Sequence, residues 1–97
     1  MKEYMQEATI KKIRLAISAL EVSIVEGNEA LRGIISAERL LEFKSVFNEV
    51  LSLLSQNTLP PKSHRHLGIA HIVVDQWPIN LELGEILIDA EQSYVEL

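Results

Sequence analysis

The sequence predicts an all-α fold, a small antiparallel helical bundle of about four helices. Its apolar residues recur three and four positions apart in four separate segments, as they do along one face of a helix. Between these segments lie short stretches with Gly, Pro or Asn, residues that interrupt helices. Because each segment has one apolar face to bury, packing the four faces around one core is the simplest arrangement.

The length and composition indicate one globular domain, residues 1–97. The 97 residues can bury roughly 60–70% of the unfolded surface, and the chain contains no cysteine. The charged N-terminus does not resemble a signal peptide, and no apolar run reaches the ~18 residues that span a bilayer. We therefore expect a soluble, cytoplasmic protein without a membrane partner.

The first predicted helix covers residues 3–26. One stripe contains its main apolar residues, Ile10, Ile13, Ile17, Leu20 and Ile24. Gly27 follows, and glycine readily adopts the left-handed conformation that ends many helices. A turn or a short helix is expected over residues 29–35.

The second predicted helix covers residues 36–56, with Ser36 as its N-cap. Its main stripe consists of Leu40, Phe43, Phe47, Val50 and Leu54, and three further leucines widen the apolar face, Leu41, Leu51 and Leu53. A face of this width needs neighbours on two sides. A homodimer that buries the excess apolar surface is therefore an alternative to a monomer.

Residues 57–63 form a connection, because consecutive prolines at 60 and 61 are incompatible with a continuing helix. Beyond it we expect a helix over residues 64–76, with Ser63 as N-cap and helical spacing of Leu67, Ala70, Val74 and Trp77. The β-branched residues of this segment also suit a strand, which would give an α+β fold. Such a strand has no visible partner in the sequence, so the helix is favoured.

Trp77 and Pro78 end this segment, and Asn80 is expected to cap a last helix. The apolar stripe of the last helix consists of Leu83, Leu87, Ala90, Tyr94 and Leu97. Trp77 is interpreted as a core residue whose indole N–H finds a partner near the turn, with an exposed interface anchor as the alternative.

Charge is distributed unevenly along the chain. The net charge is −5, and residues 75–97 contain six acidic residues and no Lys or Arg. On a helix, four of these acids fall within an arc of about 60°, away from the apolar stripe: Glu82, Glu85, Asp89 and Glu96. We call these four residues the acidic ridge. It can be a solvated face, a docking surface for a basic partner, or a carboxylate site for a divalent cation.

The three histidines lie close together in the sequence, at His64, His66 and His71. On one helix, His64 and His71 would lie about 10 Å apart along the axis, too far for one metal ion. His71 and Asp75 are expected to form an ordinary hydrogen-bonded or ionic pair. The sequence contains no glycine-rich phosphate loop and no nucleophile motif, and too few clustered Lys and Arg residues for nucleic-acid binding. We expect no cofactor and no metal.

These patterns favour a non-enzymatic protein–protein interaction domain whose acidic last helix binds a basic macromolecular partner. In size, charge and expected helicity the chain is similar in general character to bacterial immunity and antitoxin proteins, which cover a cationic toxin surface with carboxylates. This analogy rests on no motif. In this interpretation the acidic ridge supplies charge pairing, while Trp77 and Tyr94 are candidate apolar anchors.

Two other functions remain alternatives. One is a homo-oligomeric helical scaffold or adaptor that works through the apolar face of the second helix. The other is a small metal-dependent enzyme built around His64, His66 and His71.

Overall fold

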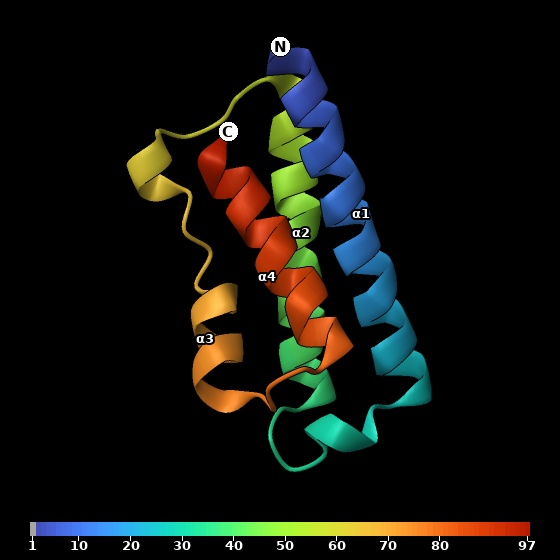
Figure 1. Ribbon diagram of the computed structural model, residues 1–97. Helices are drawn as coiled ribbons and strands as arrows, with labels where there is room; N and C mark the ends of the chain where they lie inside the picture. Colours follow the sequence, from blue (N-terminus) through green and yellow to red (C-terminus); the bar gives the residue numbers. More distant parts are fainter. Residues whose placement is uncertain (1) are drawn as a thin grey trace.

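The computed structural model describes residues 2–97, with side chains from Gln6 onward. These residues form four α-helices, α1 (Lys2–Glu26), α2 (Ala37–Gln56), α3 (Ile69–Gln76) and α4 (Glu82–Glu96), and two short 3₁₀ helices, η1 (Glu29–Leu31) and η2 (Lys62–His64). The all-α bundle predicted from the sequence is confirmed. α1 packs against both α2 and α4, and α3 packs on α4 (Figure 1).

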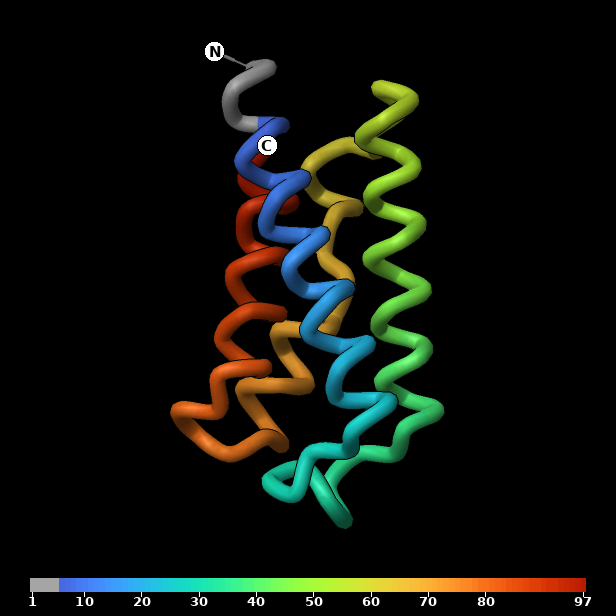
Figure 2. Tube along the Cα trace, turned by 90° about the vertical axis from the view of Figure 1, so that its right-hand side faces the viewer, coloured from blue at the N-terminus to red at the C-terminus, as the bar shows by residue number. Residues whose placement is uncertain are grey.

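The three long helices run side by side, and α1 lies between α2 and α4 when the molecule is viewed from α1 (Figure 2). α1 begins and α4 ends at the same end of the bundle, so these two helices are antiparallel (Figure 1). Within the described part of the chain, no helix combines the length and apolar character needed to cross a membrane.

The apolar stripes predicted for the long helices form the core. All five residues of the main α2 stripe are buried, from Leu40 to Leu54. On α1, the middle of the predicted stripe is buried, while Ile10 and Ile24 pack against the core from its edges. On α4, four residues of the predicted stripe are buried: Leu83, Leu87, Ala90 and Tyr94. Burial of these faces in one shared core explains why the helical spacing predicted the structure well.

The ends of α1 and α2 also follow the sequence signals. Gly27 has a φ of 80°, in the left-handed region, directly after α1. The Ser36 hydroxyl accepts a hydrogen bond from the backbone N–H of Arg39 at 3.1 Å, which confirms the predicted N-cap. At the other end of α2, Asn57 adopts a left-handed conformation with a φ of 55°. Its backbone N–H bonds the last carbonyls of the helix.

α3 is shorter than predicted. The expected helix over 64–76 begins only at Ile69, and Ser63 is not its N-cap but lies inside the short helix η2. Gly68 precedes α3 with a φ of 82°, a conformation that glycine adopts without steric cost. The left-handed residue separates α3 from the preceding loop. The strand alternative is wrong, because residues 69–76 are helical.

The face of α3 that enters the core also differs from the expected one. Ile69 and Val73 are buried, whereas Val74, expected on the inner stripe, is 70% exposed. Both stripes satisfy helical spacing, so the pattern alone could not choose between them. In the structure Val73 faces Gly84 of α4, which places Val74 on the outer side of α3.

Asn80, in the turn between α3 and α4, does not have the capping role predicted for it. Asn80 is not the N-cap of α4; the N-cap position is Leu81, which makes no side-chain capping bond. Asn80 instead has a φ of 70°. Asparagine tolerates this left-handed conformation better than most residues, so its role is to reverse the chain after Pro78.

α3 and the turn approach α4 closely at Gly84. A Cβ atom at position 84 would lie 2.9 Å from Val73 Cγ1 and 3.4 Å from Trp77 Cε3. The missing side chain therefore lets α3 and the indole ring sit directly on the first turn of α4. Trp77 is 5% exposed and also packs on Phe43 of α2, with ring centroids 6.3 Å apart.

Candidate protein-binding surface

The four residues of the acidic ridge are all exposed on α4. They do not form one continuous site. Glu96 lies about 16 Å along the helix axis from Glu85, in the last turn. Glu82, Glu85 and Asp89 lie within the first two turns, beside α1, and these three are the candidates for a common surface.

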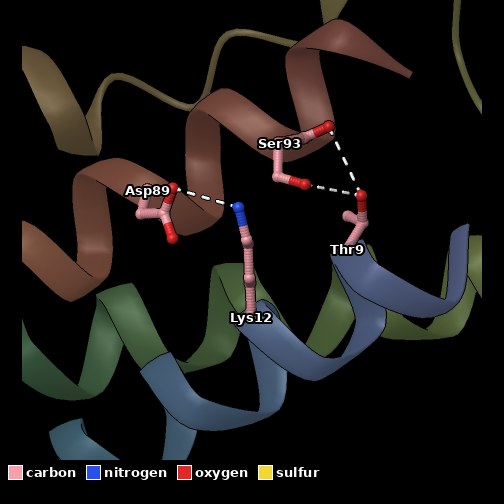
Figure 3. A network of polar contacts seen from close by, with 4 residues as sticks. All are labelled: Thr9, Lys12, Asp89 and Ser93. Atoms are coloured by element: carbon pink, nitrogen blue, oxygen red, sulfur yellow. Dashed lines mark hydrogen bonds and ion pairs between the residues drawn. The ribbon is translucent and has the colours of Figure 1, made fainter. Parts of the chain in front are cut away.

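One ridge carboxylate is already paired with a cation of the same chain. Lys12 Nζ of α1 lies 3.2 Å from Asp89 Oδ1, and both side chains are partly exposed (Figure 3). One turn further along, the hydroxyls of Thr9 and Ser93 are 2.7 Å apart and also join α1 to α4 (Figure 3). Residues 75–97 contain no Lys or Arg, so the sequence pattern offered no nearby counter-charge for the ridge. The structure supplies one for Asp89 from α1.

Glu82 and Glu85 differ from Asp89. Among the side chains from Gln6 to Leu97, none forms an ion pair with either of them. They line a groove between α1 and α4 of about 360 Å³, which we call the acidic groove; its lining residues are Lys12, Leu15, Glu82, Glu85, Ile86 and Asp89. Three carboxylates against one ammonium group leave the groove with a formal charge of −2.

The acidic groove also has an apolar part. Leu15 of α1 is 55% exposed, and Ile86 of α4 is partly buried between the two helices. A Lys or Arg side chain has an aliphatic stem and a charged head, and it packs its stem on apolar surface while the head stays polar. The groove offers both kinds of contact to such a side chain.

Position in the helix explains why Glu82 and Glu85 are tolerated together. Both lie in the first turn of α4, where the positive end of the helix dipole favours carboxylates. The dipole offsets part of their mutual repulsion and provides a structural role for them that needs no partner.

Glu91 has a role that the sequence pattern did not reveal. It is 5% exposed, and its carboxylate accepts hydrogen bonds from the backbone N–H groups of Leu67 at 3.1 Å and Ala70 at 2.8 Å. Ala70 lies in the first turn of α3, where backbone N–H groups have no partner within the helix, and Leu67 lies just before the N-cap residue Gly68. Glu91 thus caps α3 from a different helix. It is a structural carboxylate and does not line the acidic groove.

The two aromatic residues predicted as anchors are in the core. Trp77 and Tyr94 are 5% and 2% exposed, so neither projects from the surface, and the prediction that they act as exposed anchors is wrong. Trp77 contributes only to the wall of a hollow at the α3–α4 turn. The expected hydrogen bond of the indole is also missing, because Trp77 Nε1 has no acceptor among residues 6–97. Burial raises the pKa of the Tyr94 hydroxyl, an effect that nearby Arg65 opposes and Glu49 reinforces.

The histidines do not converge. His71 Nε2 lies 3.1 Å from Asp75 Oδ2 on the exposed side of α3, which confirms the predicted pair. His64 is in η2 and His66 is in the loop that follows it. Among the described residues, no three His, Asp or Glu side chains lie together as ligands of one metal ion.

Exposed apolar side chains are not confined to α2; they also lie on α1 and near the α3–α4 turn. Of the leucines that widen the α2 stripe, Leu41 is 49% exposed, and Leu51 and Leu53 are partly buried. By contrast, Val74 and Ile79 are 70% and 90% exposed at the α3–α4 turn. They border a hollow of about 240 Å³, which we call the turn pocket; its lining includes Val73, Val74, Trp77, Pro78, Ile79, Gly84, Glu85 and Ile88.

No known protein-family model matches the sequence, and no curated protein matches it significantly.

Proposed function

We propose that this protein is a non-enzymatic interaction domain that binds a basic protein through the acidic groove, in the manner of an immunity or antitoxin protein. The observation that carries the proposal is the pair Glu82 and Glu85. Both are exposed in the first turn of α4, and no side chain from Gln6 to Leu97 forms an ion pair with them. A cationic side chain of a partner would supply the missing counter-charge.

The lining of the acidic groove fits a Lys or Arg side chain of a folded partner better than it fits a small cation. Leu15 and Ile86 add apolar contact that a bare metal ion cannot use. The formal charge of −2 steers a basic surface toward the groove over a distance set by ionic screening, about 10 Å at 0.1 M salt. Asp89 is available as well once a partner cation competes with Lys12.

The proposal can be tested by nuclear magnetic resonance with a defined cationic probe. A peptide of about 15 residues, built from lysine and serine only, is titrated into the isotope-labelled protein. We expect amide shifts to concentrate at Glu82, Glu85 and Leu15. The double variant Glu82→Gln/Glu85→Gln should lose most of these shifts, because it removes both unpaired charges.

A matched control separates groove binding from general charge effects. Glu29 and Glu38 also lie in the first turns of helical segments, η1 and α2, and are exposed. The variant Glu29→Gln/Glu38→Gln changes the net charge and the helix-end electrostatics in the same way but leaves the groove intact. Equal losses of peptide binding in the two double variants, or shifts spread over the whole surface, would contradict the proposal.

A further inference from the structure

The turn pocket is bordered by two unusually exposed apolar side chains. Ile79 is 90% exposed and Val74 is 70% exposed. Single exposed apolar residues are common on protein surfaces, but here two of them frame a hollow whose other walls, Val73, Trp77 and Ile88, are also apolar. Covering this region with another apolar group would remove apolar surface from water on both sides.

The segment that presents Ile79 is held in place on either side. Trp77 is buried against Phe43, and Pro78 has a φ fixed by its ring. Asn80 follows in the left-handed conformation that reverses the chain. A side chain held outward by such neighbours loses little conformational freedom when a partner covers it, so less of the binding free energy is spent on ordering the turn.

The turn pocket and the acidic groove are adjacent. Glu85 lines both of them. On α4, Gly84 and Ile88 face the turn pocket, and Glu82 and Ile86 face the acidic groove. The two hollows thus flank the first two turns of α4, within reach of one short segment of a partner.

We propose that the turn pocket receives an apolar side chain of the same partner whose cationic side chain enters the acidic groove. The partner's contact segment is then a cationic amphipathic segment that lies across the first turns of α4. This inference rests on the function proposed above and specifies the chemistry of the partner.

The negative charge beside the turn pocket favours a cationic partner over a second copy of the chain or an anionic lipid surface. Glu82 and Glu85 are exposed beside the pocket, and residues 75–97 contain no Lys or Arg. A second copy docking by the same surface would bring these carboxylates against their own equivalents. An anionic lipid surface would be repelled in the same way. A cationic partner segment is attracted by the same charges.

Trp77 provides a built-in reporter, because it is the only Trp of the chain and lines the turn pocket. The full-length protein is titrated with two peptides of equal charge. One is the lysine–serine peptide; in the other, two serines four positions apart are replaced by leucine. We expect the leucine peptide to bind about tenfold more tightly, and we expect only this peptide to change the Trp77 emission.

Variants of Val74 and Ile79 test whether the higher affinity of the leucine peptide comes from the turn pocket. In Val74→Ser/Ile79→Ser the tenfold gain should disappear while the affinity for the lysine–serine peptide is unchanged. Both positions are exposed, so the fold should tolerate the changes. The control Val22→Ser/Val25→Ser removes two exposed valines of α1, outside the turn pocket, and should keep the gain.

The outcomes distinguish this inference from the proposed function. If the lysine–serine peptide binds through Glu82 and Glu85 but leucine adds nothing, or if its gain persists in Val74→Ser/Ile79→Ser, this inference alone is overturned. Failure of both peptides to bind overturns the proposed function and this inference with it. Self-association in sedimentation that is lost in Ile79→Ser would assign the turn pocket to a second copy of the chain. Binding to phosphatidylcholine vesicles that is lost in the same variant would assign the pocket to lipid. Either result would overturn this inference.

Discussion

Lys12 and Asp89 form an ion pair of 3.2 Å across the α1–α4 interface, so the acidic groove contains a cation of its own. Of the three ridge carboxylates that line the groove, Asp89 is therefore matched, whereas Glu82 and Glu85 form no ion pair with any side chain from Gln6 onward. It also places a positive charge where a basic partner would have to approach. The ammonium group of Lys12 should therefore weaken binding.

Replacing Lys12 by Gln should strengthen the binding of the lysine–serine peptide roughly threefold at low salt, because one repulsive charge is removed from the groove. The stability should change by less than about 1 kcal/mol, as is usual for exposed ion pairs. Calorimetric titration of the peptide and urea unfolding measure the two effects. Lys44→Gln, which removes a cation paired with Glu21 outside the groove, is the control; an equal gain there would show that net charge alone is responsible.

Replacing Glu91 by Gln should destabilise the fold by about 1–3 kcal/mol, because a buried capping interaction is lost. A carboxylate accepts from both Leu67 and Ala70, whereas an amide has one acceptor oxygen and turns a donor toward the other N–H group. Urea unfolding gives the free energy, and faster hydrogen exchange is expected at Leu67 and Ala70. Glu96→Gln, at an exposed position of the same helix, should change the stability by less than about 0.5 kcal/mol. Similar midpoints for the two variants would rule out the capping role.

Replacing Gly84 by Ala should also destabilise the protein, by about 1–3 kcal/mol. The new Cβ would meet Val73 Cγ1 at 2.9 Å and push α3 and Trp77 away from α4. This cost exceeds the gain of up to ~1 kcal/mol expected from the higher helix propensity of alanine. Thermal unfolding, with Trp77 emission as a local reporter, measures the effect. A more stable variant would show that the contact at Gly84 is not close.

The stability should fall as the pH rises above about 10, and Tyr94 should contribute to this fall. Burial raises the pKa of Tyr94 in the folded state, so the unfolded chain loses this proton first as the pH increases. The stabilisation is therefore fully present below the unfolded pKa and is lost as the pH rises through the folded pKa. Urea unfolding at neutral pH and above pH ~10 should show a smaller decrease for Tyr94→Phe than for the wild type; identical decreases would exclude the contribution of Tyr94.

The sequence predicted the parts of the fold that depend on local periodicity. The apolar stripes of α1, α2 and α4 repeat over several turns, and the structure places their residues in the core or packed against it. The N-cap at Ser36 was also predicted correctly, because it depends on residues next to it in the sequence. In these elements the information that determines the structure lies within one segment, so a pattern is sufficient.

The errors arose where distant residues decide the outcome. Two stripes of α3 had helical spacing, and the start of the helix is marked by the left-handed Gly68 together with the cap from Glu91, 21 residues from Ala70. Asp89 appeared unpaired because its partner, Lys12, is 77 residues away in the chain. The turn pocket was not predicted either, because the exposure of Val74 follows from the rotation of α3 against α4. Such contacts require the tertiary arrangement.

The most direct test of the account is the salt dependence of peptide binding to the acidic groove. The dissociation constant of the lysine–serine peptide is measured at ~0.01 M and ~0.15 M salt, where the screening length falls from about 30 to 8 Å. The account predicts a steep rise for the wild type and for Glu29→Gln/Glu38→Gln, and a much shallower one for Glu82→Gln/Glu85→Gln. Equal salt dependence in all three proteins would contradict it, because Glu82 and Glu85 would then have no special part in binding a cation.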